Sequence, residues 1–282
     1  MNRIATIGFF DGVHKGHRYL FKQLDRLAAE RNMEPLIVTF EEHPRMVLQA
    51  DYIPQLLSST GERKALLSAY GRVLMLAFQD IQSLTAEQFM QLLYTRYGVT
   101  VLLMGYDHRF GSDRMSRPQD YRRIGESIGI EVITINEFVE GELHVSSTEI
   151  RLALESGNIA VANELLGRPY SLRGTVVHGK GLGRTIGFPT ANIQPLDIHT
   201  IIPGAGVYEV DVQGEGVQAK GICNIDTRQT IEVHIPSFQG DLYGNTLKVQ
   251  FIRYLRDEKK INDLDTLQLQ ISEDLASLNM KH

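Results

Sequence analysis

One stretch near the start of the chain, residues 4–17, limits the possible folds more than any other. It opens with the short apolar run Ile4–Ile7, and the chain then turns through Gly8 and Gly12. Apolar residues at helical spacing come next: Leu20, Phe21, Leu24, Leu27 and Ala28. This order predicts a strand, a tight turn and an amphipathic helix. In an open α/β sheet, ligands bind beyond the carboxyl end of such a strand, so we expect a binding site at the turn.

Two histidines at this turn are candidates for phosphate chemistry. His14 and His17 are three residues apart, so both imidazoles can share one face of the first helical turn. The unpaired N–H groups and the dipole of a helix start favour an anion there, and glycines at 12 and 16 let a ligand approach the backbone. A zinc pair and two ordinary surface histidines are the alternatives. Zinc needs three or four ligands, and the only cysteine, Cys223, is far away in the sequence.

Length and composition limit the class of protein. A chain of 282 residues is long for one core, so we expect two domains. The net charge of -5 argues against a nucleic-acid-binding protein, which usually carries a basic face. A single cysteine suits the reducing cytoplasm, and we find neither a signal-peptide core nor an apolar run long enough to cross a bilayer. We therefore expect a cytoplasmic protein without nucleic-acid or membrane partners, and its oligomeric state stays open.

Strands and helices alternate through the first half of the chain. β-rich runs follow at 36–40, 73–77, 101–104 and 131–135, and helical patterns at 17–31, 62–70, 85–97 and 118–128. The run Thr85 to Gln88 reads as a capping box at the start of one helix. Such alternation predicts a parallel sheet with right-handed crossovers, which is a doubly wound, Rossmann-like α/β layer.

Polar residues gather in the loops after these strands. His43 follows the second strand, and Asp107 and Arg109 lie between two glycines after the fourth. Asp107 is suited to a ribose hydroxyl or a metal, and Arg109 to a phosphate. Ser146, Ser147 or Thr148 can cap a last short helix, and with Arg151 this start forms another anion site. The alternatives are a solvated charged loop around His43 and a simple N-cap before Arg151.

The motifs of the first half resemble one enzyme family. Residues 8–17 resemble the His-x-Gly-His nucleotidylyltransferases, and most of all the FAD synthetase half of the bacterial bifunctional riboflavin kinase/FAD synthetases. Residues 39–45, 105–111 and 145–151 match further motifs of the family in the expected order, although His108 replaces a common Phe. The resemblance implies that His14 and His17 stabilise charge as pyrophosphate leaves. It also implies binding roles for Gly8, Phe9, Asp11, Gly16, His43, Asp107, Arg109, Ser146, Ser147, Thr148 and Arg151.

A change of pattern marks the predicted domain boundary. A short helix is expected within 157–167, and helical periodicity then gives way to short strands, so we expect domains at 1–167 and 168–282. β-rich runs lie at 172–177, 206–212, 218–225, 231–235 and 246–254. An apolar stripe from Leu264 to Leu278 predicts one closing helix. Short strands at this spacing predict a small closed or partly closed β-barrel.

A glycine-rich run, residues 174–192, is the most informative part of the second half. It contains five glycines and ends in Pro189-Thr-Ala-Asn192. Glycine-dense backbone can form an N–H nest around phosphates, and Thr190 and Asn192, if extended, point to one side and can share a magnesium ion. The alternative is a flexible linker. The run closely resembles the riboflavin kinase motif, which implies nucleotide binding by Gly179, Lys180, Gly181, Gly183, Thr190 and Asn192, with Mg²⁺ held by the last two.

Later runs at 224–228, 231–235 and 240–244 complete the resemblance to riboflavin kinases. It implies that Glu232 is the general base, which takes the proton from the ribityl 5′-hydroxyl as that oxygen attacks the γ-phosphorus of ATP. The alternative is a strand glutamate that faces solvent. Asp226 and Gln229 replace a glycine and a proline of the family motif, and the loop between Thr230 and Glu232 is much shorter than in the family.

The resemblance spans residues 4–278 and implies a bifunctional cytoplasmic enzyme. Its second domain would phosphorylate riboflavin with MgATP to FMN, and its first would transfer AMP from a second ATP to FMN, which gives FAD and pyrophosphate. Two alternatives are an FMN adenylyltransferase whose kinase the short loop has disabled, and a flavin-binding regulatory or storage protein. The pairs His14 with His17 and Thr190 with Asn192 argue against the storage protein.

Overall fold

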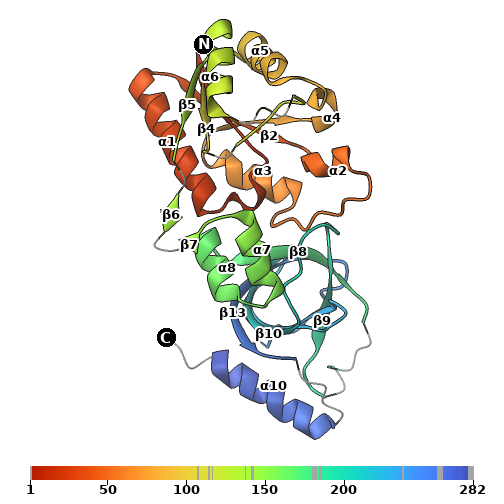
Figure 1. Ribbon diagram of the computed structural model, residues 1–282. Helices are drawn as coiled ribbons and strands as arrows, with labels where there is room; N and C mark the ends of the chain where they lie inside the picture. Colours follow the sequence, from red (N-terminus) through yellow and green to blue (C-terminus); the bar gives the residue numbers. More distant parts are fainter. Residues whose placement is uncertain are drawn as a thin grey trace. The chain divides into compact units, whose positions relative to one another are not determined.

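The computed structural model describes residues 2–278, apart from residues 107, 114, 116, 137, 141–142, 180–182, 184–185, 237 and 259–262. Contacts between residues divide the chain into two compact units, Met1–Ser146 and Ser147–His282 (Figure 1). Across these described residues, we find no helix with the length and apolar character that a membrane span requires.

The first unit is built on a five-stranded parallel sheet with the strand order β3-β2-β1-β4-β5. Its strands are β1 (Arg3–Ile7), β2 (Glu34–Phe40), β3 (Arg72–Leu76), β4 (Val99–Met104) and β5 (Glu131–Thr134). All five lie where the sequence predicts them. The central position of β1 places the turn after it in the middle of the carboxyl edge of the sheet, where α/β proteins bind ligands.

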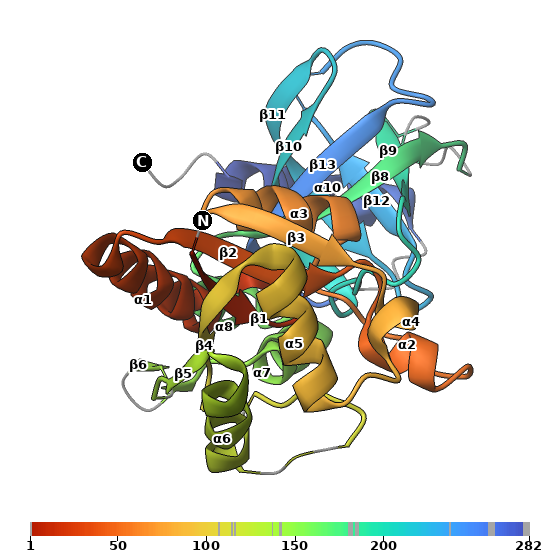
Figure 2. The same ribbon diagram turned by 90° about the horizontal axis from the view of Figure 1, so that it is seen from above.

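Helices cover both faces of this sheet (Figure 2). On one face lie α1 (Lys15–Arg31) and α3 (Thr60–Ser68), and on the other lie α5 (Ala86–Tyr97) and α6 (Pro118–Ile128). Successive residues of a strand point to opposite faces, so Ile4 packs with α1 while Ala5 packs with α5. The Rossmann-like layer that the alternating pattern predicts is therefore confirmed.

Short elements in the loops complete the first unit. They are a 3-10 turn η1 (Asp11–Val13), α2 (Pro44–Leu48), α4 (Phe78–Ile81), β6 (Val139–Glu140) and β7 (Leu143–His144). The sequence patterns miss them because so few residues show no clear period. The predicted capping box is confirmed: the backbone N–H of Gln88 donates to Thr85 Oγ1 at 3.2 Å, and that of Thr85 donates to Gln88 Oε1 at 3.0 Å.

The second unit contains a closed antiparallel barrel, in which the strands follow the order β10-β11-β12-β9-β8-β13. These strands are β8 (Tyr170–Val177), β9 (Thr190–Pro195), β10 (Gly206–Gly214), β11 (Val217–Ile225), β12 (Ile231–His234) and β13 (Thr246–Arg256). Five agree with the predicted β-rich runs, whereas the sequence indicates β9 only as an extended segment near Thr190. Cys223 is fully buried on β11.

Three helices that the structure describes accompany the barrel. Two of them, α7 (Ser147–Glu155) and α8 (Ile159–Leu166), pack against each other, and α8 also packs on β8 and β13. The third, α10 (Leu264–Leu278), places Leu278 against Val207 and Ile222 of the barrel wall. The contacts thus group residues 147–167 with the barrel. The predicted boundary at residue 168 rests on periodicity alone and stays a prediction.

Candidate active sites

The turn after β1 holds His14 and His17 against each other. His14 is the N-cap of α1, and its Nδ1 accepts a hydrogen bond from the backbone N–H of His17 at 3.4 Å. The two rings stack, with their centroids 3.5 Å apart and their planes 22° apart. A neutral imidazole whose Nδ1 accepts a hydrogen bond carries its proton on Nε2.

Asp11 fastens this turn to a neighbouring loop. Its buried carboxylate accepts a hydrogen bond from the backbone N–H of Leu57 at 3.0 Å, and the backbone N–H of Gly12 donates to Ser58 Oγ at 3.1 Å. The turn also carries left-handed backbone at Phe10 (φ 56°) and Gly12 (φ 72°). Strained backbone of this kind persists where the surroundings fix it, as Asp11 does here.

His17 is a neutral side chain in this arrangement. Burial lowers its pKa well below the ordinary value, and the neighbouring imidazoles of His14 and His108 lower that pKa further. Its Nδ1 atom is buried and has no hydrogen-bond partner among the residues that the structure describes. Within the same residues, no group of three or more His, Cys, Asp or Glu is placed to hold a metal ion.

A cavity of about 520 Å³ lies next to the histidine turn. Its lining includes several aromatic rings and basic side chains: Phe9, Phe40, Phe78, Phe89, Phe110, His43, Arg45, His108 and Arg109. Phe9 joins the cavity to the turn, because it follows Gly8 directly and its ring meets that of His43 at 4.7 Å between centroids. The Arg63 guanidinium lies 3.8 Å from the centre of the Phe9 ring and holds it in place.

The loop that carries His108 and Arg109 is fixed by backbone hydrogen bonds. The hydroxyl of Tyr121 accepts from the N–H of Phe110 at 2.9 Å and donates to its carbonyl at 2.8 Å. The N–H of Ser112 donates to the carbonyl of Leu84 at 2.9 Å. Asp107, another predicted site residue, lies outside the described residues.

The remaining predicted residues of the adenylyltransferase motifs have clear places in the chain. Nδ1 of His43 accepts from the backbone N–H of Arg45 at 3.2 Å, so His43 caps α2. Ser147 and Thr148 open α7, where Thr148 is exposed and Arg151 is half-buried one turn later. Ser146 is the last residue of the first unit. Gly16 lies under the His14 ring, where an added Cβ would lie 3.2 Å from the imidazole.

In the second unit, the register of three barrel strands brings polar residues together. Asn192 of β9 lies directly opposite Glu232 of β12, and Thr190 lies opposite His234. On the other side of β12, Asn224 of β11 also lies opposite Glu232. Residues that face each other across strands share one face of the sheet, as do residues two apart on a strand. Thr190, Asn192, Glu232 and Asn224 therefore form one polar surface, which we call the β9–β12 surface.

Glycines bring the glycine-rich run onto this surface. A Cβ added to Gly179 would lie 2.1 Å from the side-chain nitrogen of Asn192, and one added to Gly183 would lie 2.3 Å from the carbonyl of Phe188 and 3.4 Å from Thr190. Only residues without a Cβ allow this close approach. The structure thus brings together four predicted site residues besides Glu232, whereas Lys180 and Gly181 lie outside the described residues.

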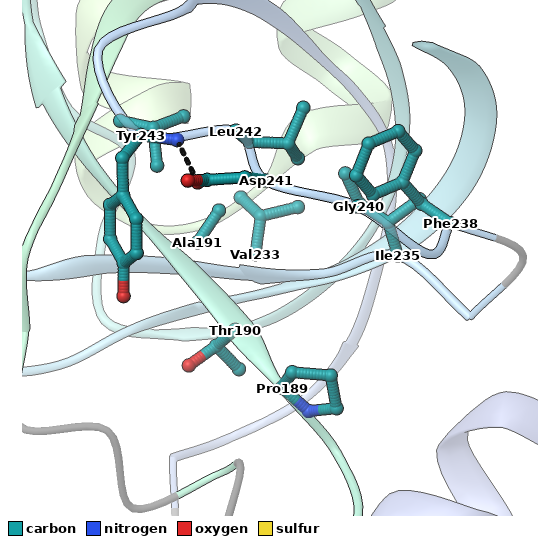
Figure 3. Close-up of a pocket in the computed structure, with 11 residues that line it drawn as sticks. Pro189, Thr190, Ala191, Val233, Ile235, Phe238, Gly240, Asp241, Leu242 and Tyr243 are labelled. Atoms are coloured by element: carbon teal, nitrogen blue, oxygen red, sulfur yellow. Dashed lines mark hydrogen bonds between the residues drawn. The ribbon is translucent and has the colours of Figure 1, made fainter.

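A small pocket of about 90 Å³ borders the β9–β12 surface at Thr190 (Figure 3). Its other walls come from Pro189, Ala191, Val233 and the run Gly240–Tyr243, among others. The Tyr243 ring stacks on His178 at 3.9 Å between centroids, and the backbone N–H of Tyr243 donates to Asp241 at 2.9 Å. The pocket has both apolar and polar walls, and one of its lining residues, Thr190, is a candidate metal ligand.

Asp226 has a structural role that the sequence patterns do not reveal. It lies in the short loop between β11 and β12, where its carboxylate accepts from the backbone N–H groups of Arg228 at 2.9 Å and Thr230 at 2.8 Å. Burial acts to raise its pKa, but these bonds and the Arg228 guanidinium bring the pKa of Asp226 down to about 2. Gln229 takes a left-handed conformation (φ 62°) inside the loop. A side chain that replaces a glycine of the family motif thus organises the shortened loop.

Comparisons with known proteins assign both halves. The FAD synthetase family model matches residues 1–149, and the riboflavin kinase family model matches residues 166–281. A bifunctional riboflavin kinase/FMN adenylyltransferase from Escherichia coli (strain K12) is 38% identical over 283 residues, which cover 96% of this chain and 90% of the relative. The Pseudomonas fluorescens relative of the same name is 36% identical, with 97% and 91% covered.

A solved structure shows the same fold over the whole chain. A Streptococcus pneumoniae crystal structure, described as a macrolide-efflux protein, superposes with a TM-score of 0.89 at 32% identity. The superposition covers 100% of this chain and 95% of that chain.

Proposed function

This chain belongs to the family of bifunctional riboflavin kinase/FMN adenylyltransferases, and from that premise we propose that it makes FMN in its second unit and FAD in its first. The observation that carries the proposal is that each unit presents its own set of phosphate-handling residues. The first holds the stacked pair His14 and His17, and the second holds the β9–β12 surface with Glu232.

In the second unit, Glu232 is the proposed general base. The 5′-hydroxyl of riboflavin loses its proton to Glu232, its oxygen forms a bond to the γ-phosphorus of ATP, and ADP leaves. Glu232 fits this role because it shares a face with both candidate metal ligands. The 90 Å³ pocket beside Thr190 is the proposed place for an apolar part of one substrate.

Thr190 and Asn192 fit a magnesium ion. Mg²⁺ prefers oxygen ligands, which a hydroxyl and a side-chain amide supply, and it usually binds with few protein groups plus substrate phosphates. The missing Cβ of Gly179 lets the Asn192 side chain lie directly against the glycine-rich run. When bound, the ion neutralises negative charge on the ATP phosphates.

In the first unit, His14 and His17 are the proposed catalytic pair. A phosphate oxygen of FMN attacks the α-phosphorus of ATP, and the bond from that phosphorus to the bridging oxygen of pyrophosphate breaks. Both imidazoles can donate hydrogen bonds to the phosphates as negative charge develops on the leaving group. Because its pKa is depressed, His17 does this as a neutral donor. The 520 Å³ cavity with its aromatic rings is the proposed place for the flavin ring.

A double variant of the first unit tests the proposal. Replacement of both His14 and His17 by Ala removes the donors, so FAD formation should be lost while FMN formation from riboflavin continues at the wild-type rate. Chromatographic separation of the flavins measures both rates in one sample. Continued FAD formation by the double variant would contradict the assigned pair, and loss of flavin binding alone would favour a storage protein.

The cytoplasm is the proposed location, because both substrates and the single buried cysteine suit a reducing compartment that contains ATP. The narrower alternative, adenylyl transfer without kinase activity, gains no support. The short loop that motivates it is organised by Asp226 and leaves Glu232 aligned with Asn224.

A further inference from the structure

His108 connects two parts of the first unit that the proposed reaction must bring together. On one side its ring lines the 520 Å³ cavity beside Phe9 and lies 6.0 Å from Phe110 between centroids. On the other side it is close enough to the histidine pair to act electrostatically on His17, after the larger effects of burial and His14. The imidazole of His108 thus lines the aromatic cavity and also acts electrostatically on the proposed catalytic pair.

The position of His108 is set by its loop. The N–H of His108 donates to the carbonyl of Gly105 at 3.3 Å, and Tyr121 bonds both backbone groups of Phe110. Further along, Asp113 accepts from the N–H of Ala86 at 3.0 Å. Because backbone hydrogen bonds of these neighbours fasten the loop, a substitution of the side chain at 108 should leave the loop in place.

The shape of FMN relates these two parts to its phosphate. The proposed function places the flavin ring in the cavity and the reacting phosphorus of ATP at His14 and His17. The ribityl chain of FMN must then extend from the cavity towards the two histidines, so that its phosphate reaches the phosphorus of ATP. We propose that His108 contacts this phosphate and sets the affinity of the adenylyl-transfer site for FMN. An imidazole N–H can donate to a phosphate oxygen, whereas the Phe that is common at this position in the family cannot. The inference rests on the proposed function of the first unit.

Kinetics of two His108 variants test the inference. In the full-length protein with FMN, ATP and Mg²⁺, His108→Phe should raise KM for FMN about tenfold, because a hydrogen bond to a charged group is lost. KM for ATP should change less than about twofold, since His14 and His17 remain. His108→Asn keeps an N–H donor and should recover most of the affinity for FMN. Circular dichroism and thermal melting of each variant show that its first unit is folded, and an unchanged riboflavin kinase rate shows that the second unit is unaffected.

A matched control shows whether the effect is specific to residue 108. His144 is an exposed histidine on β7 of the same unit, and His144→Phe should leave both KM values unchanged. An unchanged KM for FMN in His108→Phe would overturn the inference. So would a lower kcat with KM for FMN unchanged, because His108 would then act through His17. If the wild-type protein makes no FAD from FMN, the proposed function itself has failed. If His108→Phe does not fold, KM for FMN is compared between His108→Asn and His108→Ala instead.

Discussion

Asn192 and Glu232 face each other across the antiparallel pair of β9 and β12. Side chains that are directly opposed in this way have Cβ atoms about 4.5–5.5 Å apart, so the candidate metal ligand and the candidate base lie side by side. The strands that hold them are closed into a barrel, whose hydrogen bonds fix the register. The barrel therefore provides a rigid surface for the proposed deprotonation of a hydroxyl group next to bound phosphates.

Loss of the base should affect one activity only. Glu232→Gln keeps the size of the side chain but removes the group that accepts a proton, so we expect the riboflavin kinase rate to fall about 100- to 10,000-fold. FAD formation from supplied FMN should stay at the wild-type rate. The control is Glu215→Gln, at an exposed position in the turn between β10 and β11. A full kinase rate in Glu232→Gln would show that this residue is not the base.

A single methyl group at residue 179 should disturb the same surface. In Gly179→Ala the new Cβ would lie 2.1 Å from the Asn192 side chain, which is flexible and must move away. We expect the kinase rate to fall at least about tenfold, through loss of a metal ligand, with little change in the melting temperature. Gly61→Ala has open space around its Cβ and serves as the neutral control. Wild-type kinase activity in Gly179→Ala would mean that Asn192 is dispensable.

The Asp226 loop should contribute to stability and to kinase activity together. Asp226→Ala leaves the N–H groups of Arg228 and Thr230 without their acceptor, so we expect a loss of about 1–2 kcal/mol in the free energy of unfolding. Asp226→Asn keeps an acceptor oxygen and should lose less, because Arg228 is largely exposed and its ion pair contributes little. Urea unfolding measures the loss of stability, and the riboflavin kinase assay measures the loss of activity. Equal stability of the Ala variant and the wild type would contradict this role.

The stability of the first unit should depend on pH through His17. Its folded pKa lies below the ordinary value of 6.5, so the unfolded chain binds the proton more readily. The stabilisation is complete above the unfolded pKa and is lost as pH falls from about 6.5 towards the folded pKa. Melting temperatures measured between pH 8 and pH 5 should therefore decline, and His17→Gln should flatten the decline. The control His144→Gln should leave the decline as it is in the wild type. If His17→Gln also leaves it unchanged, His17 is not its cause.

Local patterns in the sequence predict most of the fold. The strand–turn–helix order at residues 4–31 and the capping box at Thr85 depend on neighbours within a few residues, and both are present in the structure. The closed barrel follows from short strands with turn residues between them. Such features are visible in a sequence because their causes are periodicity and backbone preference.

The sequence does not predict which residues that are distant in the chain come together in the structure. The alignment of Glu232 with Asn192 depends on strand register over 40 positions, and the approach of His108 to His17 depends on how two loops meet at one sheet edge. Asp226 reads in the sequence only as a departure from a motif, because its hydrogen bonds are formed after the loop closes. Tertiary contacts of this kind leave no local period to detect.

A time course of flavins tests whether this one chain carries out both successive reactions. Purified protein is incubated with riboflavin, ATP and Mg²⁺, and the flavins are separated by chromatography at intervals. We expect FMN to rise first and then to be converted to FAD. If riboflavin persists while added FMN becomes FAD, the claim of kinase activity is contradicted. If neither substrate yields product, the claim of catalysis as a whole is contradicted.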